Sequence, residues 1–300
     1  MNARSIAFGI MGRPRRSGRG WLVLCPDHAD RNPSLSVCDG ENGRILLKCH
    51  AGCSYEAIRG ALTDLGLWAG STTLPKPPET FRPVNRMDIL NAIYEGTRPF
   101  EPGGVCVRYL AGREILLTEW PRDLREHADL ELWEDGRSTG KRFPGMVSVI
   151  RDVQGQPAGL HLTFLETDES SKAPVESPRR IIGMKDGSTR GGCVRLLEPR
   201  EENIGLAEGI ETALSAFLLT GVPMWAALNA GGIERTELPQ EIRRVTIFAD
   251  HDKTGTGLKS ALKAYDRLTR EGRMVEIRQP RRIGDYNDEL KKEARMGVLA

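Results

Sequence analysis

The 300-residue sequence predicts a multidomain protein of mixed α+β and α/β class with three folded parts. Two closely spaced pairs of Cys and His residues within residues 1–70 indicate a small β module built around a metal ion. Residues 71–84 are rich in Pro, Ser and Thr, which is typical of an extended linker. From residue 201 to 290, short apolar runs alternate with segments of helical periodicity. This alternation favours a parallel sheet covered on both faces by helices.

Composition excludes several classes of protein. The apolar fraction of 39% allows an ordinary folded core, and no apolar run approaches the length that crosses a membrane. The basic N-terminus is not followed by a sustained hydrophobic region and a cleavage site, so we expect a cytoplasmic protein with no membrane partner. Six cysteines are too few for a disulfide scaffold in a chain of this length, and clustered cysteines in a reducing compartment indicate metal binding.

The net charge of +2 indicates no particular partner, but the charges are unevenly distributed. Residues 1–20 contain five arginines and no acid, and residues 172–195 contain six basic residues and two acids. Such patches are candidates for contacts with phosphates of nucleic acids or nucleotides. The candidate residues are Arg13, Arg15, Arg16, Arg19, Lys172, Arg179 and Arg180. The alternative for each of them is a solvated charge at the surface.

The two Cys/His pairs each follow a short apolar strand, over residues 21–24 and 45–48. Each tight turn places two side chains on one side of an ion, and the spacer between the turns brings the pairs together. We expect a structural Zn²⁺ held by Cys25, His28, Cys49 and Cys53. His50 is a possible substitute for one of these ligands, and Cys38 is interpreted as a small buried apolar side chain. The alternative is that the cysteines are simply buried and His28 lies at the surface.

Ser54 follows the second pair and is expected to cap a helix over residues 55–62. The module then closes at residues 67–68. Because so small a domain buries little apolar surface, we expect metal binding to supply much of its folding free energy.

The stretches from Cys25 to Ser36 and from Lys48 to Ser54 read Cys-Pro-x-His-x-Asp-Arg-Asn-Pro-Ser-Leu-Ser and Lys-Cys-His-Ala-Gly-Cys-Ser. They resemble the zinc-binding N-terminal domain of bacterial DnaG-type primases and of their phage and plasmid relatives. This resemblance implies a zinc-ribbon-like β module that contacts template DNA. Three residues rather than the commoner two separate the last two cysteines, which keeps His50 open as an alternative to Cys53.

Residues 85–200 are expected to form a basic, mixed α+β core subdomain. A helix is predicted over residues 87–94, and residues 106–115 resemble the Tyr-Leu-x-x-Arg-Gly-Ile element that opens the primase catalytic core. Lys172, Arg179 and Arg180 then resemble the basic stretch of that core that faces template and incoming nucleotide.

Residues 146–165 predict a meander of short strands, with turns at residues 152–155 and 156–159. Cys106 and Cys193 have no ligand-type neighbours in the sequence, so we interpret them as core or surface thiols rather than metal ligands.

Carboxylates end two of the strands predicted in the last part of the chain. A strand over residues 203–207 ends at Glu208, and the strand over residues 244–249 ends at Asp250 and Asp252. The carboxyl ends of parallel strands share one edge of a sheet, which is where ligands bind in open α/β sheets. Mg²⁺ and Mn²⁺ prefer oxygen ligands, so these acids predict a divalent-metal site. The alternative is that the acids cap helices or are solvated.

Ala207-Glu208-Gly-Ile-Glu-Thr-Ala and Phe248-Ala-Asp250-His-Asp252-Lys-Thr-Gly resemble a Toprim domain, a Rossmann-like parallel-sheet module found in DnaG-type primases, topoisomerases, OLD-family nucleases and RecR-type proteins. The resemblance makes Glu208, Asp250 and Asp252 the catalytic metal-binding acids. Gly284-Asp285-Tyr-Asn-Asp resembles a later acidic motif of primase relatives, which makes Asp285 a further metal-binding or substrate-positioning residue. Glu211 is expected on the surface of the following helix.

The order of zinc module, linker, core and Toprim domain matches the DnaG layout. It implies a DNA primase-like nucleotidyltransferase that makes short primers on single-stranded DNA from NTPs, with a separate replicative helicase as a possible partner, in phage, plasmid or mobile-element replication. Two metal ions would assist attack of a 3′-hydroxyl on an NTP α-phosphate. The absence of a Gly-x4-Gly-Lys-Ser/Thr motif excludes a fused helicase and an ATP-dependent OLD nuclease. The alternatives are a metal-dependent Toprim nuclease and a non-catalytic RecR-like DNA-binding scaffold.

Overall fold

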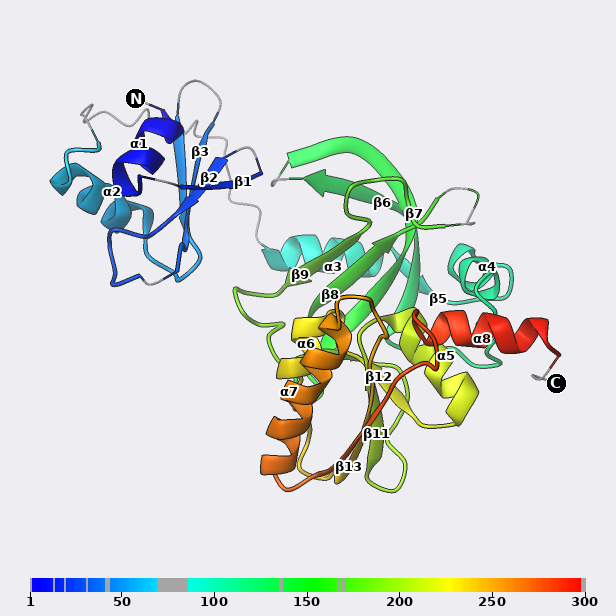
Figure 1. The fold of residues 1–300 in the computed structure, drawn as a ribbon. Helices are drawn as coiled ribbons and strands as arrows, with labels where there is room; N and C mark the ends of the chain where they lie inside the picture. The colour runs from blue at the N-terminus through cyan, green and yellow to red at the C-terminus, as the bar shows by residue number, and fades with distance from the viewer. Residues whose placement is uncertain are drawn as a thin grey trace. The chain divides into compact units, whose positions relative to one another are not determined.

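The protein is described by a computed structural model that covers residues 2–12, 14–18, 20–30, 32–40, 44–68, 86–134, 137–166, 168 and 171–297. The chain divides into two compact units, Met1–Arg82 and Pro83–Ala300 (Figure 1). The predicted linker, residues 71–84, lies outside the described residues.

The first unit is a four-stranded antiparallel sheet in the order β1-β2-β3-β4 with two helices. Its elements are α1 (Ala3–Ile10), β1 (Arg15–Ser17), β2 (Gly20–Val23), β3 (Leu35–Asp39), β4 (Ile45–Cys49) and α2 (Tyr55–Asp64). Leu35 and Val37 alternate along β3 and point into a core that also receives Ile6 of α1 and Ile58 of α2. The β module is confirmed, and Ser54 caps α2 as predicted.

Helix α1 was not expected from the sequence. Its N-cap is Asn2, whose side chain accepts a hydrogen bond from the N–H of Ser5, and the Ser5 hydroxyl pairs with the N–H of Asn2 in return. The helix buries Ala3, Ile6 and Ala7 against the sheet.

The second unit is built on a ten-stranded mixed sheet, in the order β14-β13-β11-β12-β10-β7-β6-β5, with β8 paired to β7 and β9 to β8. Its strands are β5 (Thr97–Pro99), β6 (Leu124–Glu134), β7 (Arg137–Arg151), β8 (Pro157–Phe164), β9 (Arg179–Gly183), β10 (Cys193–Arg195), β11 (Asn203–Ala207), β12 (Met224–Ala226), β13 (Arg244–Phe248) and β14 (Met274–Arg278). Its helices are α3 (Arg86–Glu95), α4 (Val105–Ala111), α5 (Ile210–Thr220), α6 (Ala230–Arg235), α7 (Thr256–Arg270) and α8 (Tyr286–Arg295).

The four strands β14, β13, β11 and β12 are parallel, which confirms the predicted parallel sheet. Alternate residues of its strands serve two separate cores, as the pleat requires. Val245 and Ile247 pack with α6 and α7 on one face, whereas Ala207 and Phe248 pack with α5 and α8 on the other. Helices therefore cover both faces.

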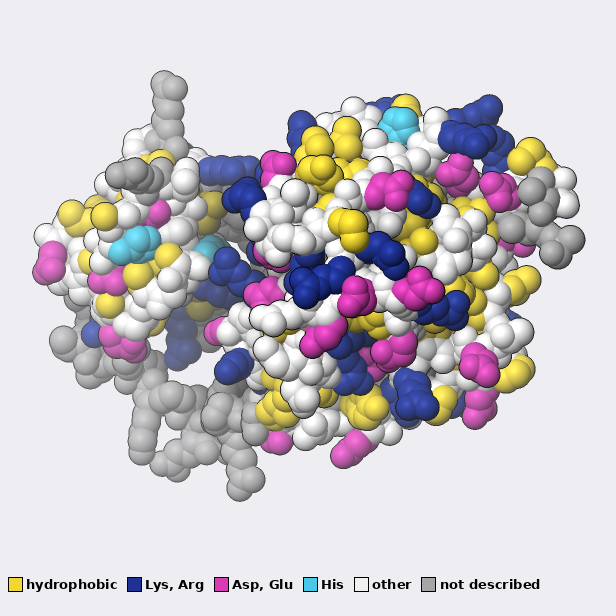
Figure 2. Space-filling model, turned by 90° about the horizontal axis from the view of Figure 1, so that it is seen from below, with side chains coloured by type: hydrophobic (Ala, Val, Ile, Leu, Met, Phe, Trp, Pro, Cys, Tyr) yellow, Lys and Arg dark blue, Asp and Glu magenta, His cyan; other side chains and the backbone are white. Residues whose placement is uncertain are grey.

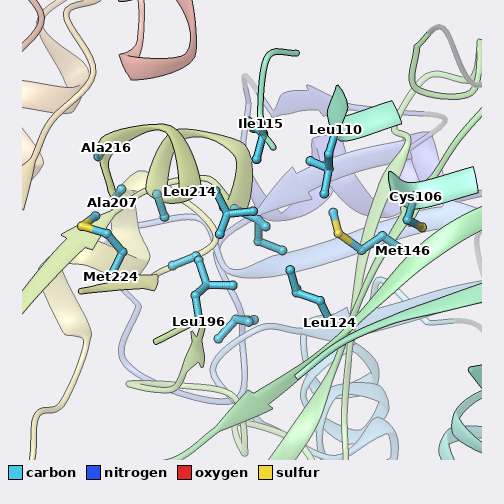
Figure 3. Packing of buried hydrophobic residues seen from close by; sticks show 14 of the residues in the cluster. Cys106, Leu110, Ile115, Leu124, Met146, Leu196, Ala207, Leu214, Ala216 and Met224 are labelled. Carbon is cyan, nitrogen blue, oxygen red and sulfur yellow. The ribbon is translucent and has the colours of Figure 1, made fainter. Parts of the chain in front are cut away.

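The core on the α5 side extends beyond the parallel strands. Leu110 of α4, Met146 of β7 and Leu214 of α5 meet in one apolar cluster (Figure 3). Cys106 lies in the same cluster, and Cys193 is buried in the other, so both are core thiols. Residues on both sides of position 200 thus share one core, within a single compact unit.

The predicted meander between residues 146 and 165 is a hairpin of two long strands instead. The turn expected at residues 152–155 is present, where the N–H of Gly155 bonds the carbonyl of Asp152. The second expected turn, at residues 156–159, is wrong because β8 begins at Pro157. Proline is tolerated as the first residue of a strand, where no ladder donor is lost.

Among the described residues, no helix combines the length and the apolar character needed to cross a membrane.

Candidate metal-binding active site

The four predicted zinc ligands come together in the first unit. Cys25 follows β2, Cys49 ends β4, and His28 and Cys53 lie in the two turns beyond them. The ligand atoms of all four lie within 4.8 Å of one another, which gives a Cys3His zinc site. His50 is not part of this set, because its Nε2 lies 2.8 Å from the hydroxyl of Ser36.

Neighbouring groups prepare these ligands for a cation. His28 directs Nδ1 at the Cys53 sulfur, 3.1 Å away, while its Nε2 lies 3.8 Å from Asp30, a carboxylate in the position that orients a metal-bound imidazole. Burial opposes ionisation of Cys49, but the N–H groups of Cys53 and Ala51 lower its pKa to about 6. A hydrogen bond with Asp27, followed by burial, raises the pKa of Cys53 to about 12. Crowded thiols of this kind ionise together only when a cation binds them.

The acidic site lies at the carboxyl edge of the parallel sheet in the second unit. Strands β11 and β13 are paired so that Ala207 lies beside Phe248. Glu208 and Asp250 directly follow the ends of these two neighbouring strands, so the pairing brings them to one edge. Both side chains are half-buried.

The turn between β13 and α7 holds the Asp252 carboxylate in place. Hydrogen bonds from the hydroxyl of Thr254 and the N–H groups of Gly257 and Thr256 keep the pKa of Asp252 well below its usual range. Gly257 is required here, because a Cβ at this position would lie 2.5 Å from the carbonyl oxygen of Asp250. Asp252 therefore stays ionised and has a fixed orientation.

Asp285 reaches the same edge through a pair of backbone hydrogen bonds. The N–H of His251 donates to the carbonyl of Gly284, and the N–H of Gly284 donates to that of His251, each at 3.0 Å. Asp285 then caps α8, with Oδ1 accepting from the N–H groups of Asn287 and Asp288. Its role as a helix cap and its place beside the other acids are compatible, since the cap uses one carboxylate oxygen.

The electrostatics of the acids fit a divalent cation. Burial, the largest cause, and the carboxylates of Glu208, Asp285 and Asp252 together raise the pKa of Asp250 to about 7, while Arg179 opposes the shift. Burial also raises the pKa of Glu208. Oδ1 of Asp250 is buried and has no hydrogen-bond partner among the described residues. A bound cation would supply that partner and neutralise the repulsion.

Within the part of the chain that the structure describes, the Cys/His set is the one group of ligand atoms gathered within 4.8 Å. The acids are spread more widely. This arrangement suits Mg²⁺, which keeps water molecules and takes further ligands from substrate phosphates.

The expectation that Glu211 lies on the surface is wrong. Its side chain is buried at 6% exposure and is held by three groups from outside its own helix. Lys172 Nζ lies 2.7 Å and Arg179 3.6 Å from the carboxylate, and the hydroxyl of Tyr109 donates to it at 2.9 Å. The apolar sequence of α5 is the signal that could have shown this, because a helix that is apolar all round has no solvent face for Glu211.

The pKa values of Lys172 and Glu211 are both lowered, which favours the charged form of the glutamate but the neutral form of the lysine. Burial opposes the charge of Glu211, but Lys172 and Arg179 hold its pKa well below the usual range. For Lys172, burial is the main cause that lowers the pKa, and repulsion from Arg179 and Arg113 lowers it further. We conclude that the pair is ionised at neutral pH, because one carboxylate faces two cations at short range.

The other predicted basic residues have varied surroundings. Arg15 and Arg16 are exposed on β1, and Arg16 lies over the ring of Trp21, 4.6 Å from its centre. Arg180 is half-buried and bonds the backbone carbonyl of Ser177. Arg13 and Arg19 lie outside the described residues. On the face of the second unit shown in Figure 2, basic and acidic side chains are interspersed.

Cys38, which we interpreted as a buried side chain, is only half-buried.

Two further polar residues near this site were not singled out from the sequence. Asn287 is 2% exposed and donates to the carbonyl of Arg113 and to the hydroxyl of Ser215, which ties α8 to α5. His161 on β8 is 4% exposed, and burial, with Arg179 nearby, lowers its pKa to about 4. Nothing in the local sequence of His161 distinguishes it, because its burial arises from strands that pair far along the chain.

Comparison with protein families supports the interpretation of the acidic site. A model described as Toprim domain matches residues 203–295, and a model described as a domain of unknown function, DUF7146, matches residues 84–196. The C-terminal part of the chain is therefore a Toprim domain, as predicted, and this implies a divalent metal. A search of curated proteins finds no match.

Several solved structures are similar in fold. The zinc-binding and RNA polymerase domains of the Aquifex aeolicus primase share 17% identity, with 95% of this chain and 79% of that chain covered and a TM-score of 0.46. A DNA primase domain from Pseudomonas aeruginosa shares 15%, with 69% and 75% covered and a TM-score of 0.45. The E. coli primase catalytic core shares 16%, with 71% and 68% covered and a TM-score of 0.36.

Proposed function

We propose that this protein is a DNA primase, a nucleotidyltransferase that joins NTPs into short primers on single-stranded DNA. The observation that carries the proposal is the set Glu208, Asp250 and Asp252 at the carboxyl edge of a Toprim domain, with Arg179 acting electrostatically on Glu208 and Asp250. The Cys3His module in the same chain favours a primase over other users of the Toprim domain.

The acids would hold two Mg²⁺ or Mn²⁺ ions, which supply charge neutralisation and a lowered pKa for the attacking 3′-hydroxyl. Asp252 is ionised and fixed by its turn, so it is ready to bind before substrate arrives. Asp250, whose pKa burial and nearby carboxylates raise to about 7, ionises fully only when a cation offsets this burial and repulsion, and burial raises the pKa of Glu208 as well. Asp285, with one carboxylate oxygen outside its helix cap, completes the set.

The basic residues would bind the phosphates of substrate and template. Arg179 acts electrostatically on both Glu208 and Asp250, and it would contact a phosphate held at the metal site. The residues that would contact the template are Arg180, Arg13, Arg15, Arg16 and Arg19. Single-stranded DNA affinity should therefore fall steeply as salt rises. A separate replicative helicase, and a setting in phage, plasmid or mobile-element replication, belong to the same proposal.

The test is primer synthesis by the full chain on single-stranded templates of mixed sequence, with labelled NTPs and Mg²⁺ or Mn²⁺. We expect labelled oligonucleotides, and a loss of about 100-fold or more in an Asp250→Asn/Asp252→Asn variant, since both metal-binding charges are removed. The matched control is Glu241→Gln, an exposed acid in the loop before β13, which should keep full activity.

The same experiment separates the alternatives. Shortened template without new oligonucleotides would identify a metal-dependent Toprim nuclease, in which water replaces the 3′-hydroxyl. DNA binding without either product, unchanged in the double variant, would identify a RecR-like scaffold and would refute the enzymatic proposal.

A further inference from the structure

One edge of the large sheet ends at a strand whose outer side is free. β14 is the last strand in the sheet order and, in the described part of the chain, pairs only with β13. The N–H of Met274 donates to the carbonyl of Arg243, which precedes β13. Because the hydrogen-bonding groups of successive residues alternate in direction, those of Val275 and Ile277 point away from the sheet. This edge can therefore pair with another strand.

Beside this edge, α7 exposes an apolar stripe. Leu258, Leu262 and Tyr265 are 37%, 48% and 38% exposed, and their spacing of four and three residues places them on one side of the helix. Single exposed apolar residues are ordinary at a protein surface, whereas a contiguous group of large ones is typical of an interaction site.

The stripe lies on the side of α7 that faces the free edge. On the opposite side, Ser260 and Lys263 bond the carboxylate of Glu234 in α6, which lies next to α7 (Figure 1). Helix α6 follows β12, toward the middle of the sheet, whereas α7 packs against β14. At 3.6 residues per turn, the stripe is turned away from Ser260 and Lys263. The stripe and the free side of β14 thus form one surface, which we call the β14–α7 surface.

The charges on β14 are self-complementary. Glu276 and Arg278 lie on the same face of the strand and pair at 2.9 Å. If a second β14 pairs antiparallel with the centre at Ile277, Glu276 of each copy stands opposite Arg278 of the other. With the centre at Glu276 instead, two glutamates would stand opposite each other and repel. The charge pattern therefore favours the register centred on Ile277.

We propose that the β14–α7 surface binds a second copy of this chain, by antiparallel pairing of the two β14 strands centred on Ile277. The two copies would be related by a twofold axis and would share one continuous sheet, with the two apolar stripes packed together over it. A second copy satisfies the backbone groups, the stripe and the charges at the same time. Because the paired strands run in opposite directions, the acids of the two copies would lie at opposite ends of the joined sheet. The proposal therefore does not depend on the proposed function.

The test is sedimentation velocity of the full chain, with its zinc, over a range of concentrations. The pairing adds one strand and one helix face from each copy, so we expect a dimer with a Kd on the order of 10 µM and a monomer in dilute solution. Leu262→Lys should weaken association by about tenfold or more, because it puts a charge between the two stripes. The matched control is Leu116→Lys, at a residue that follows α4 and is 65% exposed, which should associate as the wild type does.

Reversal of charges tests the register. Glu276→Arg and Arg278→Glu should each weaken association by about tenfold or more, since like charges then stand opposite each other. The double variant Glu276→Arg/Arg278→Glu should associate like the wild type, because the opposite signs are restored. In the single chain this exposed pair adds little to stability, so the variants remain folded and the effect is seen in association.

Three results would overturn the inference. A wild-type chain that stays monomeric at about 100 µM, ten times the expected Kd, would show that the surface does not bind a second copy. A dimer that persists in Leu262→Lys and in both single reversals would use another surface. A dimer that is lost in Leu262→Lys but is not restored in the double reversal would refute the pairing of β14 centred on Ile277.

Discussion

At the scale of single residues, the buried carboxylate of Glu211 is the clearest case for a role in stability. It is the common partner of Lys172, Arg179 and Tyr109, so its removal leaves a lysine ammonium group unpaired at a largely buried position. We expect Glu211→Gln to lower the free energy of unfolding by about 3 kcal/mol, the usual cost of breaking a buried pair. Denaturant unfolding of the full chain measures this, with primer synthesis as a second readout.

The control for Glu211 is an exposed ion pair. Glu276 pairs with Arg278 at 2.9 Å on the surface, and Glu276→Gln should change stability by less than about 0.5 kcal/mol. The effect also depends on pH. Because the pKa of Glu211 in the folded chain is below its ordinary value of 4.5, its stabilisation is present above pH 4.5 and is lost as pH falls below it. A difference between wild type and Glu211→Gln that grows on acidification would contradict this account.

Asp250 should behave in the opposite way. Burial, with the nearby carboxylates, raises its pKa from 3.8 to about 7, so ionising it costs stability as pH rises through that interval. Without added Mg²⁺, Asp250→Asn should therefore be more stable than wild type at pH 8, by about 1–3 kcal/mol after allowance for its partial exposure. The difference should shrink as pH falls from 7 toward 4. Thermal unfolding of the second unit measures it, and a less stable variant at pH 8 would count against the crowded-acid interpretation.

At the scale of elements, the sequence predicted the strands, helices and metal site whose residues are close together in the chain. The apolar runs that end at Glu208 and at Asp250 are β11 and β13, and the intervening segments are the helices expected between parallel strands. The Cys/His spacing located a metal site without any knowledge of the fold. In each case the residues that carry the signal are neighbours in sequence.

The rest of the site depends on contacts between distant segments. Lys172 and Glu211 are 39 positions apart, and only the packing of α5 against the core places one beside the other. Residues 187–192, before β10, likewise meet residues 227–229, after β12, only because β10 pairs with β12. Neither of these contacts produces a periodicity or a spacing in the sequence. The turn expected at residues 156–159 was wrong for the same reason, because pairing with β7 extends β8 to Pro157.

At the scale of the whole molecule, the two units should differ in how they depend on metal. The core of the first unit is small and includes two zinc ligands, Cys25 and Cys49, so its folding is coupled to metal binding. The second unit contains larger apolar clusters in which none of the zinc ligands takes part.

Zinc removal should therefore unfold one unit and spare the other. We expect one zinc per chain by metal analysis, and a strong chelator should abolish the thermal transition of the first unit while that of the second shifts by no more than a few degrees. Trp21 and Trp68 pack in the first unit, so their fluorescence should change on chelation. Cys25→Ser should lose the zinc, whereas Cys38→Ser, a thiol outside the ligand set, should keep it. Loss of both transitions together would mean that the two units fold as one, because independent cores do not lose their stability to the same ligand.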